Sequence, residues 1–178
     1  MSNHHGQIIS VEPYGTPELH ESVWLAPGAI VVGNVTIGAG SSIWYNAVVR
    51  GDSDAVRIGE RTNAQDGVVI HTFRGQATVI GDDVSMGHNA VVHGATVENG
   101  CLIGMSATVL NGAVVGEGSL VAAGALVPQG MVIPPHSLVA GVPARVVREL
   151  RDSDREAVRE NSAVYLEYTE NHRAATAE

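Results

Sequence analysis

The sequence predicts an all-β fold, a parallel β-helix of hexapeptide repeats with triangular coils, followed by a C-terminal α-helix. Three observations predict it. Aliphatic residues recur at every sixth position, a small or β-branched residue stands two positions before most of them, and glycine often follows them. This period is the signature of hexapeptide β-helices. The 21 glycines and the aromatic content of 4% agree with a narrow prism that holds one aliphatic and one small side chain per side.

The aliphatic positions make about 20 six-residue units, hence about six to seven coils, stacked at the parallel-strand spacing of roughly 4.8 Å. The regular positions are Val31, Ile37, Ile43, Val49, Ile58, Ala64, Ile70, Ile80, Met86, Val92, Val97, Ile103, Val109, Val115, Val121, Val127, Ile133 and Val139. Two steps are longer, because Val49 to Ile58 spans nine residues and Ile70 to Ile80 spans ten. We expect each of them to hold one unit that carries a short loop.

A helix is expected to follow the repeat. The turn at 141–143 breaks the strand register, and the sequence at 153–156 has the pattern of a capping box. We therefore divide one domain into a β-helix over residues 1–143 and a C-terminal helix, packed along it, over residues 144–178. The helix face expected to meet the prism is Ala157, Asn161, Val164 and Tyr168. Trp24 and Trp44 stand next to repeat positions, so they should point outward against the helix or another subunit.

Three histidines fall where the repeat fixes their geometry. Arg50, His71 and His93 each directly follow an aliphatic residue, and those aliphatic residues are three units apart, so the three side chains form an outward column on one side. Asp66 and His88 stack in the same way on a different side. Because stacked coils are roughly 4.8 Å apart, His71 and His93 can share a metal through imidazole nitrogens at roughly 2.1 Å.

His88 projects from another side of the triangle and cannot reach that pair within one chain. A closed three-fold trimer would place the side of each chain that carries His71 and His93 against the side of the next chain that carries His88. Three equivalent sites would then be complete. The alternative is that these are three surface histidines among the eight in the chain. The stacked register favours the metal site.

The motifs around these histidines resemble those of the gamma-class carbonic anhydrases and their close homologues. The matching runs are Arg50-Gly51-Asp52, then Asn63-Ala64-Gln65-Asp66-Gly67-Val68-Val69-Ile70-His71, then Gly87-His88-Asn89-Ala90-Val91-Val92-His93-Gly94, and the likeness extends to Gly141-Val142-Pro143-Ala144 and the helix. The resemblance implies a left-handed β-helix and a homotrimer. It also implies zinc, with iron or cobalt as alternatives, bound by His71, His88 and His93 across the subunit interface.

The resemblance implies roles for the neighbouring residues too. Arg50, Asp52 and Asp66 would hold the interface by ion pairs. Gln65 would hydrogen-bond the metal-bound hydroxide, and Asn63 beside it is the second candidate catalytic residue. Three imidazoles leave zinc an open position, and the ion lowers the pKa of bound water to about 7. The implied activity is the reversible hydration of carbon dioxide to bicarbonate.

The chain departs from the best-characterised branch of that family at two places. A glutamate there follows the aspartate of the Arg-x-Asp run, whereas Ser53 stands here, and the long acidic loop after the first histidine is replaced by 72–75, which has no acid. Because both features are linked to proton export, we expect slow hydration. Two other classes stay open: a hexapeptide acyltransferase or thioesterase acting on acyl-CoA, and a non-catalytic metal-binding scaffold.

Composition limits the remaining partners. The net charge of −9 without a basic block argues against nucleic acid. No apolar run approaches the roughly 20 residues that span a bilayer, and the N-terminus has no signal pattern. We therefore expect a cytoplasmic protein without a membrane partner. Cys101 stands at an inward position, which predicts a buried thiol in a reducing compartment.

Overall fold

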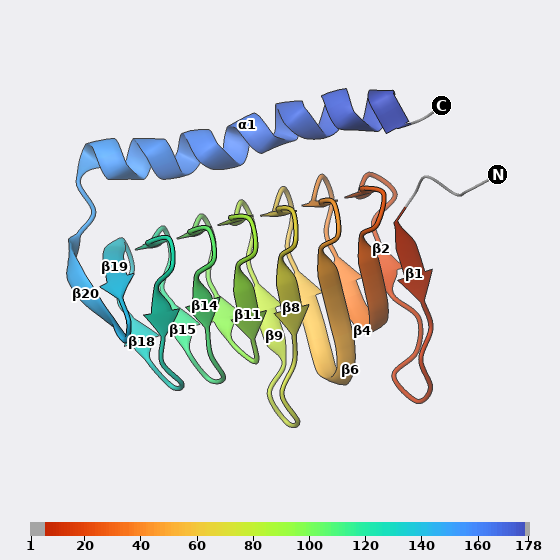
Figure 1. Cartoon of the computed structure of the whole chain (residues 1–178), viewed down its shortest axis with the longest axis horizontal. Helices are drawn as coiled ribbons and strands as arrows, with labels where there is room; N and C mark the ends of the chain where they lie inside the picture. Colours follow the sequence, from red (N-terminus) through yellow and green to blue (C-terminus); the bar gives the residue numbers. More distant parts are fainter. Residues whose placement is uncertain (1–5, 177–178) are drawn as a thin grey trace.

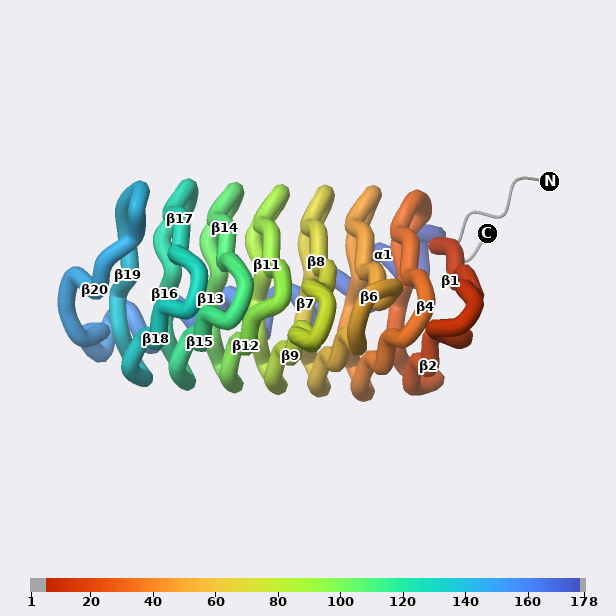
Figure 2. The backbone as a smooth tube through the Cα atoms, turned by 90° about the horizontal axis from the view of Figure 1, so that it is seen from below, coloured from red at the N-terminus to blue at the C-terminus, as the bar shows by residue number. Residues whose placement is uncertain are grey.

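The computed structural model describes residues 6–176 as a parallel β-solenoid with one long helix beside it (Figure 1). Seven coils stack along the long axis, and each coil contributes strands to three sides of a prism. The coils lie side by side with the helix behind them in Figure 2. The predicted fold class is therefore confirmed.

The strands fall into three parallel ladders, one on each side of the prism. The first side holds β1 (Gln7–Ile9), the first parts of β4 (Ile30–Ile37) and β6 (Val48–Ile58), β8 (Val69–His71), β11 (Val91–His93), β14 (Thr108–Val109) and β17 (Leu126–Val127). The second side holds β2 (Glu18–Leu19), the second parts of β4 and β6, β9 (Thr78–Ile80), β12 (Thr96–Val97), β15 (Val114–Val115) and β18 (Val132–Ile133). The third side holds β3 (Trp24–Leu25), β5 (Ser42–Ile43), β7 (Asn63–Ala64), β10 (Ser85–Met86), β13 (Leu102–Ile103), β16 (Leu120–Val121) and β19 (Ser137–Gly141).

The core is the column of repeat residues inside the prism. Val49, Ile70 and Val92 pair in register along the first side and are fully buried, as the sequence predicts. Each such side chain contributes roughly 1.5–3 kcal/mol when it leaves water. Cys101 is also fully inside the core, and burial raises the pKa of its thiol to about 12.

The two longer steps of the repeat behave differently. The step from Ile70 to Ile80 contains the expected short loop, whose ends bridge at Phe73 and Gln76. The step from Val49 to Ile58 is not a loop that leaves the strand, because β6 runs continuously from the first side to the second. The extra residues are absorbed by a shift in its pairing with β4.

The corner between the third and first sides needs a residue in the left-handed region. Gly67 has a φ of 68° there, and Asn89 of the next coil has a φ of 59°. A Cβ atom on Gly67 would meet the end of the Asn89 side chain, which would have to move, and the positive φ at this position also favours glycine. This corner also holds Asp66 and His88, which directly precede these two residues.

Helix α1 (Asp152–Thr176) begins near the last coil and runs back along the third side of the prism toward the first coil (Figure 1). The predicted boundary at residue 144 needs correction, since β20 (Ala144–Glu149) precedes α1 and pairs antiparallel with β19. The start of α1 also differs from the predicted capping box, because Asp154 accepts a hydrogen bond from the backbone N–H of Arg151.

The buried face of α1 is shifted by about one position from the predicted one. Its buried residues are Val158, Ser162 and Thr169, whereas Ala157 and Tyr168 are exposed. The helix rotates to this face because it covers an aromatic cluster on the third side. That cluster contains Trp24, Trp44, Tyr45, Tyr165 and His172, so the two tryptophans do meet the helix. None of the helices within residues 6–176 has the length and apolar character needed to traverse a lipid bilayer.

Candidate metal centre

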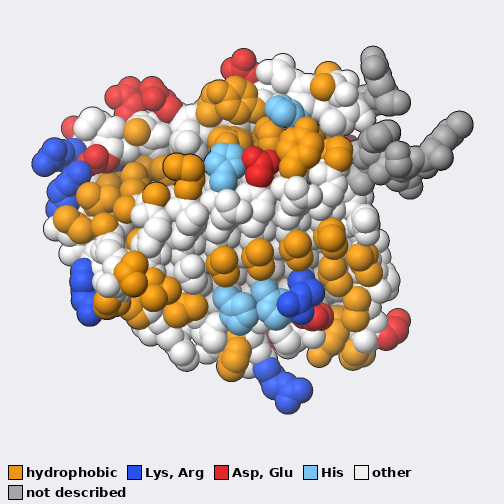
Figure 3. Space-filling model, viewed as in Figure 1, with side chains coloured by type: hydrophobic (Ala, Val, Ile, Leu, Met, Phe, Trp, Pro, Cys, Tyr) orange, Lys and Arg blue, Asp and Glu red, His pale blue; other side chains and the backbone are white. Residues whose placement is uncertain are grey.

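Two of the candidate ligands lie side by side on the first side of the prism. Arg50 pairs with His71, and His71 pairs with His93, in consecutive coils. The two imidazole rings have centroids 5.0 Å apart, and His71 Nδ1 lies 3.0 Å from His93 Nε2. Histidine side chains sit next to basic and acidic groups below a row of hydrophobic side chains in Figure 3. The predicted register is therefore confirmed for this column.

The outer nitrogen of each ring has an oxygen partner. His71 Nε2 lies 2.8 Å from Asp52 Oδ1, and His93 Nδ1 lies 2.5 Å from Asn111 Oδ1. Partial burial alone would raise the pKa of Asp52, but hydrogen bonds from His71 and Arg50 outweigh it and hold that pKa below its ordinary value. Asp52 is therefore a carboxylate at neutral pH, and His71 Nε2 must carry the hydrogen that it accepts.

When Asn111 Oδ1 accepts the hydrogen of His93 Nδ1, the two inner nitrogens face each other without hydrogens. Two lone pairs 3.0 Å apart repel unless a positive centre, a proton or a metal ion, lies between them. Nitrogens bound to one tetrahedral zinc ion at about 2.1 Å lie roughly 3.4 Å apart, close to the observed separation. Oxygen partners on the outer nitrogens are also what metal-binding histidines usually have. The His71–His93 pair thus fits a metal ion.

His88 lies elsewhere, in the corner that follows β10. Its Nδ1 is 2.9 Å from Asp66 Oδ2, and its Nε2 is 3.5 Å from the Tyr165 hydroxyl of α1. The hydrogen on Nδ1 is therefore directed to a carboxylate, which leaves Nε2 as the nitrogen with a lone pair. The other oxygen of Asp66 is buried and has no partner within the described chain. His88 has the same carboxylate support as His71.

The two candidate catalytic residues are on the third side under α1. Asn63 and Gln65 are only 2% and 4% exposed. Gln65 Nε2 lies 3.2 Å from Asn63 Oδ1 and 3.2 Å from Ser85 Oγ. The predicted site residues thus form two groups within one chain. The first-side group is Arg50, Asp52, His71 and His93, and the third-side group is Asn63, Gln65, Asp66 and His88.

No three ligand-type side chains come close enough to hold one ion among residues 6–176 of a single chain. Within the chain, Arg50 pairs with Asp52 at 2.6 Å, so two of the three residues predicted at the interface already contact each other. Asp66, the third of these residues, contacts His88 within the chain.

The sequence reasoning did not assign several residues that contact the predicted ones, although it placed Asn161 on the helix face that meets the prism. Asn111 supports His93, and it stands one residue beyond the position that stacks on His93, because Val92 pairs with Val109 in the next coil. Ser85 and Asn161 contact the third-side group. Ser85 pairs with Asn63 in register and was predictable, whereas Asn161 comes from α1 and its position depends on how the helix packs.

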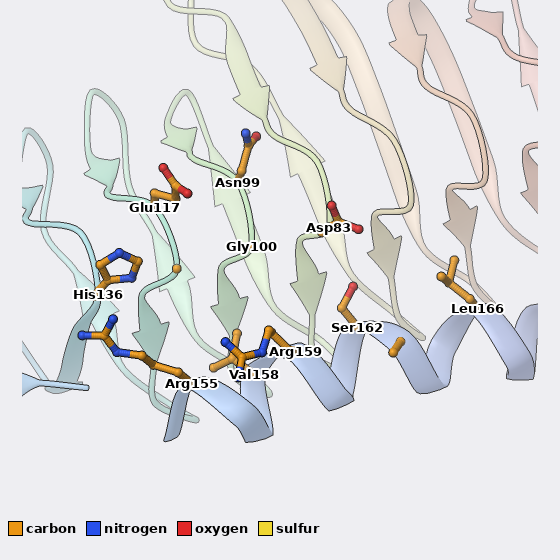
Figure 4. Close-up of a pocket in the computed structure, with 12 residues that line it drawn as sticks. Asp83, Asn99, Gly100, Glu117, His136, Arg155, Val158, Arg159, Ser162 and Leu166 are labelled. Carbon is orange, nitrogen blue, oxygen red and sulfur yellow. The ribbon is translucent and has the colours of Figure 1, made fainter. Parts of the chain in front are cut away.

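One cavity lies away from both groups. It has a volume of about 590 Å³ and separates α1 from the corners of several coils (Figure 4). Its lining includes Asp83, Glu117, His136, Arg155 and Ser162, none of which belongs to the predicted site. A metal site on an outward side of the prism would not produce such a cavity, because its walls would come from two different chains.

Comparisons with known proteins agree with this architecture. A family model described as bacterial transferase hexapeptide (six repeats) matches residues 16–51 and 94–129. A Methanocaldococcus jannaschii protein named "Probable carbonic anhydrase" is 57% identical over 152 residues, covering 85% of this chain and 96% of its own. A Geobacillus kaustophilus protein named "Carbonic anhydrase" is 43% identical over 155 residues, covering 87% and 84%.

Among solved structures, a Bacillus cereus protein provisionally described as an acetyltransferase superimposes with a TM-score of 0.93 at 36% identity. The match covers 98% of this chain and 99% of that one. The similar proteins therefore carry names from two enzyme classes on one fold.

Proposed function

The chain belongs to the hexapeptide-repeat family of gamma-class carbonic anhydrases, and on that premise we propose that it hydrates carbon dioxide reversibly to bicarbonate at metal sites between the subunits of a homotrimer. The observation that carries the proposal is the pair of facing ring nitrogens, His71 Nδ1 and His93 Nε2, 3.0 Å apart. Their outer nitrogens are committed to Asp52 and Asn111.

His88 of a neighbouring subunit supplies the third imidazole in this proposal. Its Nδ1 is held by Asp66, so Nε2 is the nitrogen available for a metal. Zinc, or iron or cobalt in its place, supplies a Lewis acid that lowers the pKa of a bound water to about 7, so that a hydroxide nucleophile exists near neutral pH. The chain itself supplies fixed ring orientations and the correct tautomers.

The subunit contact would also satisfy a buried acceptor. Asp66 Oδ1 is buried without a partner, and Arg50 projects from the first side with a side chain that is 43% exposed. A guanidinium from the neighbouring chain can donate to that oxygen while it keeps its bond to Asp52, because guanidinium has five N–H donors. Such a pair explains why a half-satisfied carboxylate is placed beside a metal ligand.

The remaining residues of the first side set the rate. The loop at 72–75 contains no carboxylate. The hydroxyl groups of Ser53 and Thr72 are hydrogen-bonded to each other at an Oγ–Oγ1 distance of 2.8 Å. No acidic group of this loop is placed to receive the proton that the reaction releases. We therefore propose slow turnover, with the proton passed directly to buffer.

Transfer of an acyl group from coenzyme A is the second candidate, favoured by the 36% identical Bacillus cereus structure described as an acetyltransferase. One feature of the chain weighs against it. The three histidines have carboxylate or amide support that suits metal ligands, whereas an acyltransferase needs one histidine base. A metal-binding scaffold without catalysis would keep the same site and show no turnover.

Protein purified without a tag separates these candidates. We expect a trimer with about one transition metal per chain, carbon dioxide hydration in stopped-flow assays, and a rate that rises with buffer concentration. Bound metal without carbon dioxide hydration and without thiol release from acetyl-CoA would indicate the scaffold. Release of thiol from acetyl-CoA without hydration would indicate the acyltransferase, and a metal-loaded monomer would refute the intersubunit site.

A further inference from the structure

A hydrogen-bond network joins α1 to the third-side group beneath it. Asn161 Oδ1 of α1 lies 2.6 Å from Ser85 Oγ, and Ser85 Oγ lies 2.9 Å from Asn63 Oδ1. Gln65 Nε2 is 3.2 Å from both Ser85 Oγ and Asn63 Oδ1. Asn63, Gln65 and Ser85 are at most 4% exposed. Because these polar groups are buried, they must satisfy one another, and their hydrogens can be counted.

This count shows that donor and acceptor must be exchanged in one of the two contacts between Ser85 and the asparagines. The Ser85 hydroxyl has one hydrogen but faces two amide oxygens, Asn63 Oδ1 and Asn161 Oδ1. The two ends of an amide have nearly the same shape, so the position of oxygen and nitrogen follows from the network. If Asn161 presents its Nδ2 to Ser85 Oγ, then Ser85 donates to Asn63 Oδ1, and Gln65 Nε2 donates to the same oxygen. One turned amide thus gives each of these contacts a donor and an acceptor, while Asn63 Nδ2 stays a buried donor without a partner among residues 6–176.

The reverse direction has the opposite consequence for Gln65. If Asn161 accepted from Ser85, Asn63 would have to turn and donate through Nδ2, and Gln65 would have to turn and accept through Oε1. Two buried amides would change instead of one. The end of Gln65 that points away from Asn63 would then be an N–H donor, whereas in the first arrangement it is the oxygen acceptor.

We infer that Asn161 is a positioning residue that sets the direction of this network and thereby fixes the Gln65 amide with Oε1 outward. This inference rests on the proposed function of the site, in which the outward end of Gln65 faces the nucleophile. An outward oxygen accepts a hydrogen bond from the O–H group of the nucleophile and so directs its lone pair toward carbon dioxide. An outward amide N–H₂ would instead donate to that lone pair and occupy it.

Asn161→Asp tests the direction rather than the packing. A carboxylate has the same shape but only accepts hydrogen bonds, so Ser85 must donate to it and the Gln65 amide should turn. Asn171→Asp is the matched control, since it makes the same chemical change at an exposed position of the same helix. Asn161→Ala is the second variant, which removes the donor without adding an acceptor. The assays are run above pH 8 so that the new side chain is ionised.

Two measurements are compared in the trimer. The first is kcat for carbon dioxide hydration with KM, bound metal and trimer mass. For Asn161→Asp and Asn161→Ala we expect kcat to fall about 10- to 100-fold, as is typical when a residue that hydrogen-bonds to groups of a site is replaced. The bound metal and the mass of the trimer should not change. The second is hydrogen exchange of the Gln65 side-chain amide by NMR. We expect protection in the wild type and in Asn171→Asp, and rapid exchange in Asn161→Asp.

The outcomes distinguish this inference from the proposed function. If the wild type hydrates no carbon dioxide, the proposed function fails, yet amide exchange still tests the direction of the network. Unchanged kcat and a protected Gln65 amide in Asn161→Asp would overturn the inference. Loss of metal or of the trimer in that variant would also overturn it, since Asn161 would then hold the fold together rather than orient Gln65.

Discussion

The first and third sides of the prism carry the two halves of the candidate metal centre, and they differ in what covers them. On the third side α1 lies over the strands, so Trp44 is only 4% exposed and Asn63 and Gln65 are buried. On the first side Val69 is 38% exposed, although it stands directly before Ile70 in the same strand. The third side is therefore organised within one chain, whereas the first side presents its ligands uncovered.

This difference indicates that the two sides have separate roles in the candidate site. The covered side fixes orientation, because Gln65 and Asn63 are held in a buried network with Ser85 and Asn161. The uncovered side provides a pair of nitrogens and a row of apolar side chains that a second chain can meet. Four changes, taken from the largest expected effect to the smallest, break or sharpen this comparison.

Removal of one ligand from either side should abolish metal binding. His71→Ala and His88→Ala trimers should each lose nearly all bound metal, because two imidazoles hold zinc far more weakly than three. Refolding an equal mixture of the two should restore metal, since an intact first side can then meet an intact third side. Random assembly gives one complete site in each mixed trimer, hence about one quarter of the wild-type metal. Elemental analysis measures it.

The homogeneous trimers serve as controls for that experiment. Each mutant refolded alone should remain without metal at the same protein concentration. If mixing restores no metal, all three ligands come from one chain or the trimer does not form, and the division between the two sides is wrong.

Removal of a large side chain that packs beneath α1 on the third side should lower the stability of the fold rather than directly weaken metal binding. Trp44→Ala removes a large buried ring that packs against Trp24, Tyr165 and His172, so we expect a loss of about 3–5 kcal/mol in the free energy of unfolding. Val69→Ala on the uncovered side should change the unfolding of the isolated chain by less than about 1 kcal/mol. Denaturant titration of both variants in dilute, metal-free protein compares them, and equal losses would contradict the comparison.

Loss of the carboxylate behind His71 should weaken metal binding without removing a ligand. In Asp52→Asn the amide can donate to His71 Nε2, which allows the hydrogen to move to Nδ1, the nitrogen that faces His93. We expect metal affinity to fall about 10- to 100-fold, as measured by competition with a chelator. Asp54→Asn is a suitable control, because the hydrogen bond to the side chain of Asp54 comes from the backbone N–H of the next residue, Ala55. An unchanged affinity would show that Asp52 does not set the tautomer.

The smallest effect concerns the start of α1 at low pH. Hydrogen bonds from the Arg148 side chain and the Arg151 backbone lower the pKa of Asp154 below its ordinary value. A carboxyl whose pKa is lower in the folded state stabilises the fold above its unfolded pKa and stops doing so as the pH falls through its folded pKa. The protection of the backbone amides in the first turn of α1, relative to an unfolded chain at the same pH, should therefore fall below about pH 4. In Asp154→Asn this protection should be low at every pH. Unchanged protection of the wild type below pH 4 would refute the role of this pair.

The sequence predicted the strand register well because hexapeptide counting is exact. Each repeat residue must point inward, so counting places Arg50, His71 and His93 in one column without any knowledge of distant contacts. The error at Val49–Ile58 arose because the count gives the number of extra residues but not whether they leave the sheet. The boundary at residue 144 was wrong for a similar reason, since a proline turn also permits an antiparallel strand such as β20.

The sequence by itself determined the prism and the sides that carry His71, His88 and His93, because both follow from a local period. The tertiary structure alone decided how α1 rotates, since its aromatic contacts with Trp24 and Trp44 outweigh the weak periodicity of its own sequence. It also decided which groups Gln65 meets, because the contact between Ser85 and Asn161 joins residues 76 positions apart. Local patterns fix what repeats, whereas a single contact between distant elements depends on packing energies that no short stretch of sequence contains.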